Sequence, residues 1–399
     1  ARVEDPELLP TTNKAMLMAR FDEWSSDRDV TLAEAEAFAQ DTSRIGERFR
    51  GRYTLATTSG TTGRRGIFLL DDRSMAVTNA VAVRMLTSWL TGLDLLKLLI
   101  GGGRMAMVMA TGGHFASTVA AARLQRGRGP RLSVLSAQMP LPEIVAQLNP
   151  FRPAIVAAYA SMAALLAGEQ QAGRLRIRPV LLALSAEGLE QGQYKRIGET
   201  FGAKIGNSYA ATECPFMSYS CNEGWLHVIS DWVKLEPVDA QHRPVPPGDT
   251  SHTVLISNLA NRLQPILRYD LGDSVVERPD PCPCGSPLMA IRVTGRSGDA
   301  LVFTASTGSP VTIVPGAFAI ALGDVPGIQL WQLAQTSPTR LRLRMRLADH
   351  RTGDAWMAAC AKLERLLHDH GVGHVAIERA EEPPEQTAGG KFRQILPVA

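Results

Sequence analysis

Residues 57–66, T-T-S-G-T-T-G-R-R-G, constrain the fold of this chain more than any other stretch. Three glycines and five hydroxyl side chains in ten positions are incompatible with a core strand or a helix interior. Glycine lets the backbone approach an anion, successive N–H groups form a concave nest, and hydroxyl groups add donors. The stretch predicts a phosphate-binding loop, with a flexible surface turn as the alternative. No Lys follows the second glycine at the spacing of G-x-x-x-x-G-K-S/T, so the loop is of a different kind.

Length and charge narrow the class of protein. A chain of 399 residues exceeds what one hydrophobic core usually supports, so two domains are predicted. The 42 basic and 39 acidic side chains nearly balance, which gives no electrostatic case for a nucleic acid or an anionic membrane as partner. The main apolar run, residues 154–167, is shorter than the roughly 20 residues of a spanning helix. Residues 1–10 contain three acidic side chains and no apolar segment, so no secretory signal is predicted and the expected location is cytoplasmic.

Helical patterns alternate with short apolar strands through the first half of the chain. Residues 52–58 and 67–70 predict two strands flanking the phosphate loop. Further strands are predicted at 105–110, 132–135, 155–158 and 180–184, and helices at 31–40, 75–90, 118–124, 141–148 and 194–201. This alternation predicts an α/β fold with a parallel sheet covered by helices on both faces and ligands at the carboxyl ends of the strands.

The second half of the chain predicts two further units. Residues 226–277 are strand-rich with Pro and Gly breaks, which favours a smaller antiparallel unit within the large domain. Residues 341–347 alternate strictly, predicting a strand with arginines on its solvent face. Trp356, Cys360, Leu363 and Leu367 predict one apolar face of a helix. We therefore expect a large N-terminal domain, residues 1–295, and a small α+β C-terminal domain, residues 296–399.

Five motifs follow one another in a recognisable order. They are S-G-T-T-G at 59–63, Y-A-A-T-E at 209–213, R-Y-D-L-G-D at 268–273, G-R-S-G-D at 295–299 and G-G-K-F-R at 389–393. This order resembles that of the adenylate-forming superfamily, which includes acyl-CoA synthetases, luciferases and the adenylation domains of peptide synthetases. The residues that follow Glu213 are most similar to the phenylacetate-CoA ligase branch: Cys221, Trp225, His227, Asp231 and Glu236.

The resemblance assigns the nucleotide site residue by residue. It implies that Tyr209 packs on adenine, Thr212 reaches the α-phosphate, Glu213 binds Mg²⁺, and Asp273 and Arg296 hold the ribose. For Tyr209 to Glu213 the alternative is a solvated strand end, and for Asp273 with Arg296 it is a surface ion pair. The full set expected to bind ATP or AMP is Ser59, Gly60, Thr61, Thr62, Gly63, Arg64, Ser185, Ala186, Glu187, Asn207, Ser208, Tyr209, Ala210, Thr212, Asp273 and Arg296.

Catalysis and acid binding follow from the same resemblance. Lys391 matches the family lysine whose ammonium bridges the acyl carboxylate and the phosphate, and together with Thr212 and Glu213 it forms the expected catalytic set. A solvated lysine near the end of the chain is the alternative. The residues expected near the acyl group are His114, Tyr159, Ser161 and Gly206, with a structural role as the alternative for His114.

Cysteine placement predicts a second metal site. Cys282 and Cys284 lie in P-C-P-C-G, and with Cys221 and His227 they could close a tetrahedron around a structural Zn²⁺. Free buried thiols are the alternative. A site closed by four protein ligands leaves no open position for catalysis.

The sequence thus predicts ATP-dependent adenylation of an aryl or arylalkyl carboxylic acid, release of pyrophosphate, and transfer of the acyl group to coenzyme A. An amine, a carrier-protein thiol or AMP left on the substrate are alternative outcomes, and a catalytically silent nucleotide-binding protein is an alternative of another class. A homodimer is also considered. Two positions depart from the family's pattern. Arg64 and Arg65 replace its Lys-Pro, which keeps positive charge for pyrophosphate but changes the geometry. Gly298 replaces its charged hinge residue, so rotation of the C-terminal domain is expected about a freer hinge.

Overall fold

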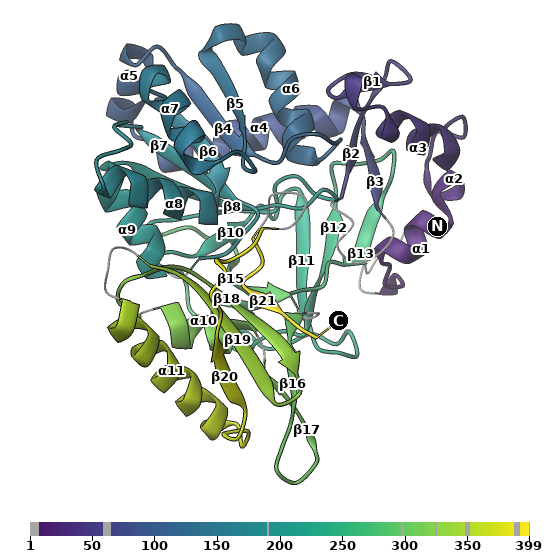
Figure 1. Ribbon diagram of the computed structural model, residues 1–399. Coiled ribbons are helices and arrows are strands. Elements are labelled where there is room, and N and C mark those ends of the chain that lie inside the picture. The colour runs from purple at the N-terminus through teal and green to yellow at the C-terminus, as the bar shows by residue number, and fades with distance from the viewer. Residues whose placement is uncertain are drawn as a thin grey trace.

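The computed structural model describes residues 8–58, 65–189, 191–296, 299–313, 315–323, 325–347, 352–386 and 392–398 (Figure 1). The largest sheet in these ranges has nine strands in the order β14-β15-β10-β9-β8-β7-β6-β4-β5. Its parallel half consists of β4 (Met105–Met109), β5 (Leu132–Ser136), β6 (Ile155–Tyr159), β7 (Leu181–Ser185) and β8 (Lys204–Tyr209). The alternation of strand and helix predicted from the sequence is confirmed.

Helices cover this parallel half because its strands are apolar on both faces. They are α4 (Asp72–Trp89), α5 (Gly92–Ile100), α6 (Ala116–Arg128), α7 (Leu141–Phe151), α8 (Ala160–Gln171) and α9 (Gln191–Phe201). Helix α8 is buried along residues 160–167, so it lies inside the fold and packs against the strands on one side and the C-terminal unit on the other. A helix that is apolar all round is stable only in such a position.

The other half of the large sheet is antiparallel. It consists of β9 (Ser218–Ser220), β10 (Leu226–Val228), β14 (Asp273–Glu277) and β15 (Ala290–Arg296). A separate antiparallel sheet contains β11 (Val233–Val238), β12 (Thr253–Asn258) and β13 (Ile266–Asp270). The antiparallel unit expected over residues 226–277 is therefore present, but its first and last strands join the large sheet.

The N-terminal residues form a cover of three helices and a small sheet. The helices are α1 (Lys14–Ala19), α2 (Phe21–Trp24) and α3 (Leu32–Gln40), followed by the 3₁₀ turn η2 (Thr42–Arg44). Outside this cover, the 3₁₀ turn η3 (Gly129–Arg131) connects α6 to β5. Thr31 caps α3 by accepting the backbone N–H of Glu34. The sheet consists of β1 (Arg48–Phe49), β2 (Tyr53–Thr57) and β3 (Ile67–Leu70). The two strands predicted on either side of the phosphate loop are confirmed as β2 and β3, which pair antiparallel. Residues 59–64 between them lie outside the described ranges.

The C-terminal residues form a separate α+β unit, at the bottom of Figure 1. Its elements are β16 (Leu301–Thr304), β17 (Pro310–Ile313), α10 (Pro315–Gly323), β18 (Ile328–Ser337), β19 (Arg340–Leu347), α11 (Thr352–Asp369), β20 (Ala376–Arg379) and β21 (Ile395–Leu396). Four of these strands form a sheet in the order β20-β19-β18-β21. No helix in the described ranges combines the length and apolarity that a membrane span requires.

Two sequence predictions for this unit differ from the structure. The fully buried face of α11 consists of Ala355, Ala359, Leu363 and Leu367, while Trp356 and Cys360 lie at its margin. Alanines allow the helix backbone to approach the sheet, and the larger Trp356 ring instead packs near Arg379. Arg344 was expected to face solvent, but its side chain is only 14% exposed because the acidic segment around Glu382 covers it.

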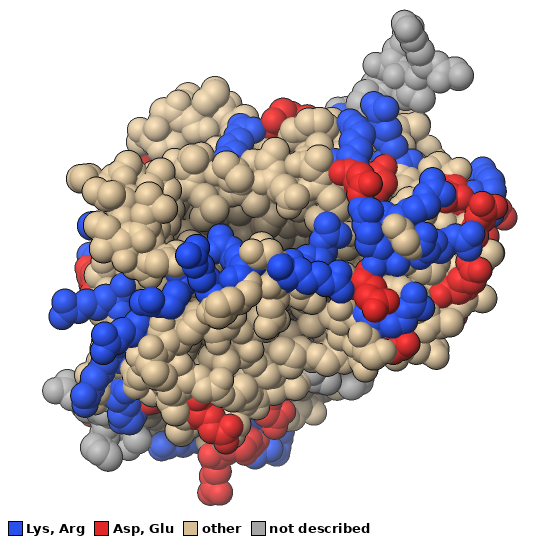
Figure 2. Space-filling view, turned by 90° about the horizontal axis from the view of Figure 1, so that it is seen from above, with Lys and Arg blue, Asp and Glu red and all other residues tan. Residues whose placement is uncertain are grey.

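Surface charge is unevenly spread despite the small net charge. Figure 2 shows a band of Lys and Arg side chains across the face seen from above. Exposed Arg131, Arg152 and Arg178 each precede a parallel strand closely in the sequence, so the amino edge of the parallel half is basic. The carboxyl edge, where ligands were predicted, is the opposite edge of the same strands.

Leu363→Ala should destabilise the C-terminal unit by about 2–5 kcal/mol, because it removes a fully buried side chain and leaves a cavity. Met357→Ala in the same helix is the matched control: its side chain is 64% exposed, so a change within about 0.5 kcal/mol is expected. Denaturant unfolding of both variants measures the difference. Equal losses would show that α11 does not pack as described.

Candidate active site

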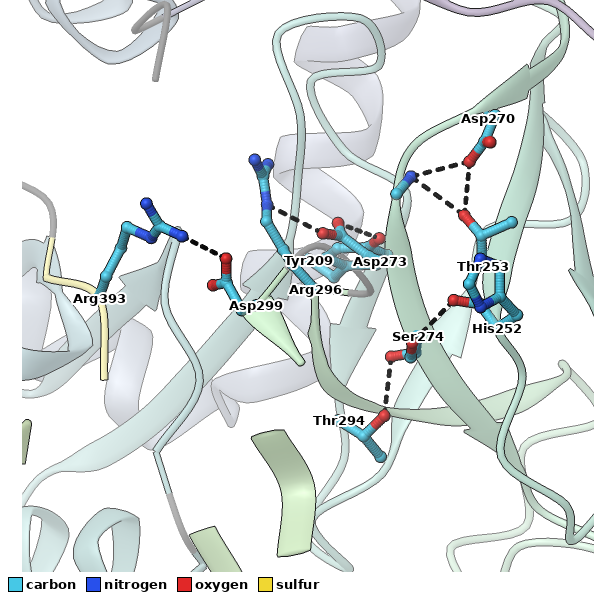
Figure 3. A network of polar contacts seen from close by, with 11 residues as sticks. Tyr209, His252, Thr253, Asp270, Asp273, Ser274, Thr294, Arg296, Asp299 and Arg393 are labelled. Atoms are coloured by element: carbon cyan, nitrogen blue, oxygen red, sulfur yellow. Dashed lines mark hydrogen bonds and ion pairs between the residues drawn. The ribbon is translucent and has the colours of Figure 1, made fainter. Parts of the chain in front are cut away.

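Three motifs that are far apart in the sequence meet at the carboxyl end of β8 (Figure 3). The hydroxyl of Tyr209, the last residue of β8, donates to Asp273 Oδ2 at 2.7 Å. Arg296 Nε lies 3.2 Å from Asp273 Oδ1, because Asp273 and Arg296 are paired across β14 and β15. The residues predicted to hold adenine and ribose are thus in contact with one another.

Burial controls the electrostatics of this group. Asp273 is 8% exposed, and burial raises the pKa of its carboxyl group, while Arg296 and the Tyr209 hydroxyl oppose the shift. Burial, together with the Asp273 charge, also raises the pKa of Tyr209 well above its usual value. Each carboxylate oxygen has two lone pairs, so Asp273 can accept further hydroxyl groups without losing its present partners. A carboxylate acceptor beside a guanidinium donor is suited to a vicinal diol.

Glu213 is a second buried carboxylate beside this group. It is 7% exposed, and the Tyr269 hydroxyl donates to its Oε1 at 2.8 Å. The Asn258 side-chain amide holds the Glu213 carbonyl at 3.1 Å, which fixes the backbone of the turn after β8. Burial raises the pKa of Glu213, and the Tyr269 hydrogen bond opposes that shift. A carboxylate held in this way offers the hard oxygen ligand that Mg²⁺ prefers.

Tyr269 is a site residue that sequence reasoning missed. It lies within R-Y-D-L-G-D, where the motif drew attention to Asp273 alone. Its position on β13 points its side chain inward, where it is 3% exposed and reaches Glu213. A Tyr flanked by polar residues in a predicted strand was the available signal, because the period of two places it on the buried face. Thr212 precedes Glu213 in the same turn and is partly buried.

Glu187 makes a contact that the sequence did not predict. Ser185 ends β7. Ala186 follows with a φ of 70°, in the left-handed region that residues other than glycine rarely adopt. The Glu187 carboxylate then accepts the backbone N–H of Ser161 at 3.0 Å through Oε2, and the N–H of Phe392 through Oε1. Contact of residues 185–187 with a nucleotide remains a prediction.

Three of the four residues predicted near the acyl group, Tyr159, Ser161 and His114, occupy two places. The Tyr159 hydroxyl accepts the N–H of Ala110 at 3.0 Å, and the buried Ser161 Oγ has no hydrogen-bond partner among the described residues. Both lie at the carboxyl end of β6. The His114 ring is buried against the N-terminal cover, with Nε2 2.9 Å from the carbonyl oxygen of Asp41. Their contact with substrate remains a prediction.

Gly206 on β8 is in close contact with Trp89, the last residue of α4. A Cβ atom on Gly206 would lie 2.3 Å from the Trp89 ring, so only glycine fits there. The Trp89 indole donates to the Ser220 carbonyl at 3.0 Å, which fixes the ring against β8. Asn207, the next residue, donates from its side chain to the Tyr194 hydroxyl at 3.1 Å. Sequence reasoning identified Gly206 but not Trp89, because the sequence does not show which side chain packs against a glycine.

Four predicted metal ligands gather at the antiparallel half of the sheet, one on β10 and three in the adjoining loops. The ligand atoms of Cys221, His227, Cys282 and Cys284 all lie within 4.8 Å of one another. The Cys221 and Cys282 sulfurs are 3.8 Å apart, and Cys284 Sγ is 3.2 Å from His227 Nε2. With Zn–S bonds of about 2.3 Å, two sulfurs of a tetrahedral site lie about 3.8 Å apart, so the donors suit Zn²⁺. His227 Nδ1 lies 3.1 Å from the Leu288 carbonyl, a contact that leaves Nε2 free to bind a metal.

The remaining predicted site residues divide into described and undescribed ones. Ser208 is buried on β8, and Ala210 lies in the turn that follows. Residues 59–64, which include the phosphate-loop residues Ser59 to Arg64, lie outside the described ranges, as do Gly298 and Lys391.

Glu213→Gln should raise the melting temperature of the ligand-free protein. Burial raises the pKa of this carboxyl in the folded protein, whereas in the unfolded chain it ionises in water at the ordinary glutamate pKa. Stability therefore falls as pH rises above that ordinary pKa, because the unfolded state loses the proton first. The gain should therefore be larger near about pH 8 than near about pH 5. Glu199→Gln, at a side chain that is 67% exposed, is the control. A gain that is equal at both pH values would contradict a raised pKa at Glu213.

Comparison with known proteins identifies the fold. A scan against protein-family models finds no match, and a search of curated proteins finds none. The structure of 2-hydroxyisobutyryl-CoA ligase in the postadenylation state with 2-HIB-AMP is 20% identical, with a TM-score of 0.66 over 99% of this chain and 81% of that chain. The same ligase in an open conformation with 2-HIB-AMP and CoA, also 20% identical, gives 0.53 over 98% and 81%. The anthranilate CoA ligase AuaEII in complex with anthranoyl-AMP is 14% identical, with 0.55 over 85% and 65%. This chain therefore has the fold of the adenylate-forming acyl-CoA ligases, as the order of its motifs predicted.

Proposed function

We propose that this protein activates a carboxylic acid with ATP and then transfers the acyl group to coenzyme A. The observation that carries the proposal is the meeting of Tyr209, Asp273 and Arg296 beside the buried carboxylate of Glu213. This group offers an aromatic ring, a diol acceptor, a diol donor and a hard oxygen ligand within one site. These are the groups that MgATP requires.

In the first half-reaction, a carboxylate oxygen of the acid attacks the α-phosphorus of ATP in line. The bond from the α-phosphorus to the bridging oxygen of pyrophosphate breaks, and the products are an acyl-AMP anhydride and pyrophosphate. In our proposal Asp273 and Arg296 fix the ribose, and Glu213 together with Thr212 orients the α-phosphate region. A Mg²⁺ ion held by Glu213 would neutralise charge on the phosphates.

Lys391 is proposed as the residue that stabilises the transition state. Its ammonium would bridge the acyl carboxylate and the α-phosphate as charge develops there. The proposal is supported by the two residues that follow Lys391 in the sequence. The Phe392 N–H donates to Glu187, and Arg393 pairs with Asp299. A cationic side chain held at the place where charge develops acts without reorganisation during the reaction.

The acid is proposed to be aryl or arylalkyl, as in a phenylacetate-CoA ligase-like enzyme. Trp89 and Tyr159 provide aromatic surface near β6 and β8, and one similar structure is a ligase bound to anthranoyl-AMP. Another acceptor, such as an amine or a carrier-protein thiol, is the second candidate for the transfer step. A homodimer and a cytoplasmic location are also part of the proposal.

Pyrophosphate release across a panel of aryl and alkyl acids, with and without coenzyme A, tests the proposal. We expect release with an aryl or arylalkyl acid, and formation of the thioester only when coenzyme A is added. Acyl-AMP that accumulates unchanged in the presence of coenzyme A would point to another acceptor. An absence of pyrophosphate release with every acid would favour a silent nucleotide-binding protein.

Lys391→Ala should reduce the rate of acyl-AMP formation by about 10²–10³-fold, since one preorganised contact at a transition state is worth about 3–4 kcal/mol. ATP affinity should change little, because the proposed base, ribose and metal contacts lie in the large domain. Lys97→Ala, at a side chain that is 66% exposed on α5, is the control. Single-turnover adenylation and calorimetric ATP titration measure the two effects. An unchanged adenylation rate would refute the assignment of Lys391.

We further propose that Cys221, His227, Cys282 and Cys284 bind a structural Zn²⁺. The proposal rests on the mutual distances of the four donors and on the carbonyl that fixes the tautomer of His227. The cluster joins β9 and β10 to the loop before β15, so a metal there would cross-link the end of the large sheet. Its contribution would be folding energy rather than chemistry.

The purified protein should contain close to one zinc per chain, and Cys282→Ser with Cys284→Ser should remove it and lower the melting temperature. Cys360→Ser is the matched control, because Cys360 lies on α11 in the C-terminal unit and should leave the zinc content unchanged. Elemental analysis and thermal unfolding measure both effects. Protein that was never exposed to a chelator and contains no zinc would exclude the site.

A further inference from the structure

Residues 392–396 are fixed by contacts with both parts of the chain. Phe392 is 8% exposed and packs in the same apolar cluster as the parallel strands and α8, together with Leu330 of β18. Ile395 pairs with Leu333 in the parallel ladder between β21 and β18. Arg393 pairs with Asp299, in the segment that joins β15 to β16 (Figure 3). This stretch therefore lies at the boundary between the large domain and the C-terminal unit.

Gln332 secures the C-terminal side of this boundary. The side chain is 1% exposed, and its Nε2 donates to the carbonyl oxygens of Glu385 at 3.1 Å and Arg393 at 2.9 Å. Its Oε1 accepts from the Glu385 N–H at 3.1 Å and from Arg344 at 2.9 Å. One buried amide thus ties together the two chain positions that flank Lys391 in the sequence.

Glu187 secures the same stretch from the large domain. Its Oε1 accepts the N–H of Phe392, the amide that directly follows residue 391, and its Oε2 accepts the N–H of Ser161. Ser161 is in the first turn of α8, where backbone N–H groups have no partner within the helix and an anion is favoured. The left-handed Ala186 turns the chain after β7 so that the carboxylate faces both donors. Each oxygen of Glu187 therefore meets an N–H group, a role that only a carboxylate fills.

We propose that Glu187 is a positioning residue for adenylation, which places Lys391 by holding the peptide N–H next to it at the carboxyl edge of the parallel sheet. The inference rests on the proposed function, because it assumes that Lys391 acts on the acyl carboxylate and phosphate. Because Glu187 follows β7 and Phe392 precedes β21, the contact joins the parallel sheet to the C-terminal strand ladder. Glu187 acts on the rate of the first half-reaction and not on nucleotide affinity.

Glu187→Gln tests this role with little change of shape. A glutamine has one acceptor oxygen, so its NH₂ group would face the N–H of either Ser161 or Phe392. We expect single-turnover acyl-AMP formation to slow by about tenfold or more, since charge-assisted hydrogen bonds are the stronger kind. The Kd for ATP should stay within about twofold, and Glu187→Asp, which keeps two acceptors, should recover part of the rate. Glu199→Gln on α9 is the matched control, with no change expected.

Combination with Lys391→Ala separates positioning from direct binding. If Glu187 acts only through the lysine, Glu187→Gln should slow adenylation by less than about twofold in the Lys391→Ala background, because residues acting as a unit are not additive. The same tenfold loss in both backgrounds, or a weaker Kd for ATP in Glu187→Gln, would overturn the inference and favour direct nucleotide contact. An unchanged adenylation rate in Glu187→Gln, with Lys391→Ala impaired, would overturn it as well.

Hydrogen exchange gives a readout that does not depend on activity. The peptide containing residues 392–398 should exchange faster in Glu187→Gln than in the wild type or Glu199→Gln, because the Phe392 amide loses its acceptor. Unchanged exchange would show that the contact does not hold the tail, and would overturn the inference. If the wild type adenylates no acid, or Lys391→Ala has no effect, the proposed function fails instead, and the exchange result still decides whether Glu187 holds this segment.

Discussion

The antiparallel pairing of β9 with β8, at Tyr209 and Ser218, is the contact on which the rest of the structure depends. At this point the parallel, helix-covered half of the sheet changes into an antiparallel half that continues to β14 and β15. The change brings Asp273 and Arg296 to the carboxyl edge of strands that precede them by many residues in the chain. A site with contributions from both halves is possible only because one continuous sheet carries both.

Much of the fold and part of the site could be predicted from the sequence. Alternating strand and helix patterns gave the parallel half, because each strand is buried on both faces. The order of the motifs resembles that of the adenylate-forming superfamily, and this resemblance identified Tyr209, Asp273 and Arg296. The contacts of Tyr269 and Glu187 could not be found in this way. One depends on which strands lie face to face, and the other joins a side chain to a backbone N–H, which every residue except proline possesses.

Two buried carboxylates give the ligand-free site an electrostatic cost. Burial raises the pKa values of both Glu213 and Asp273. Within the described residues, Asp273 alone of the two has a guanidinium in contact. Cationic ligands and hydroxyl groups would relieve this cost on binding, so the site is less stable empty than filled. The hydrogen bonds from Tyr209 and Tyr269 limit the cost without removing the negative charge that a metal–nucleotide complex needs.

The position of Phe392 in the apolar cluster of the parallel sheet also affects how the protein is made. The strands and helices of that cluster leave the ribosome long before residue 392, and domains generally fold as they emerge. The apolar cluster therefore stays incomplete until Leu330 and Phe392 have both been made. Translation that stops before Phe392 would leave a folded domain with exposed hydrophobic surface, a substrate for chaperones and proteases.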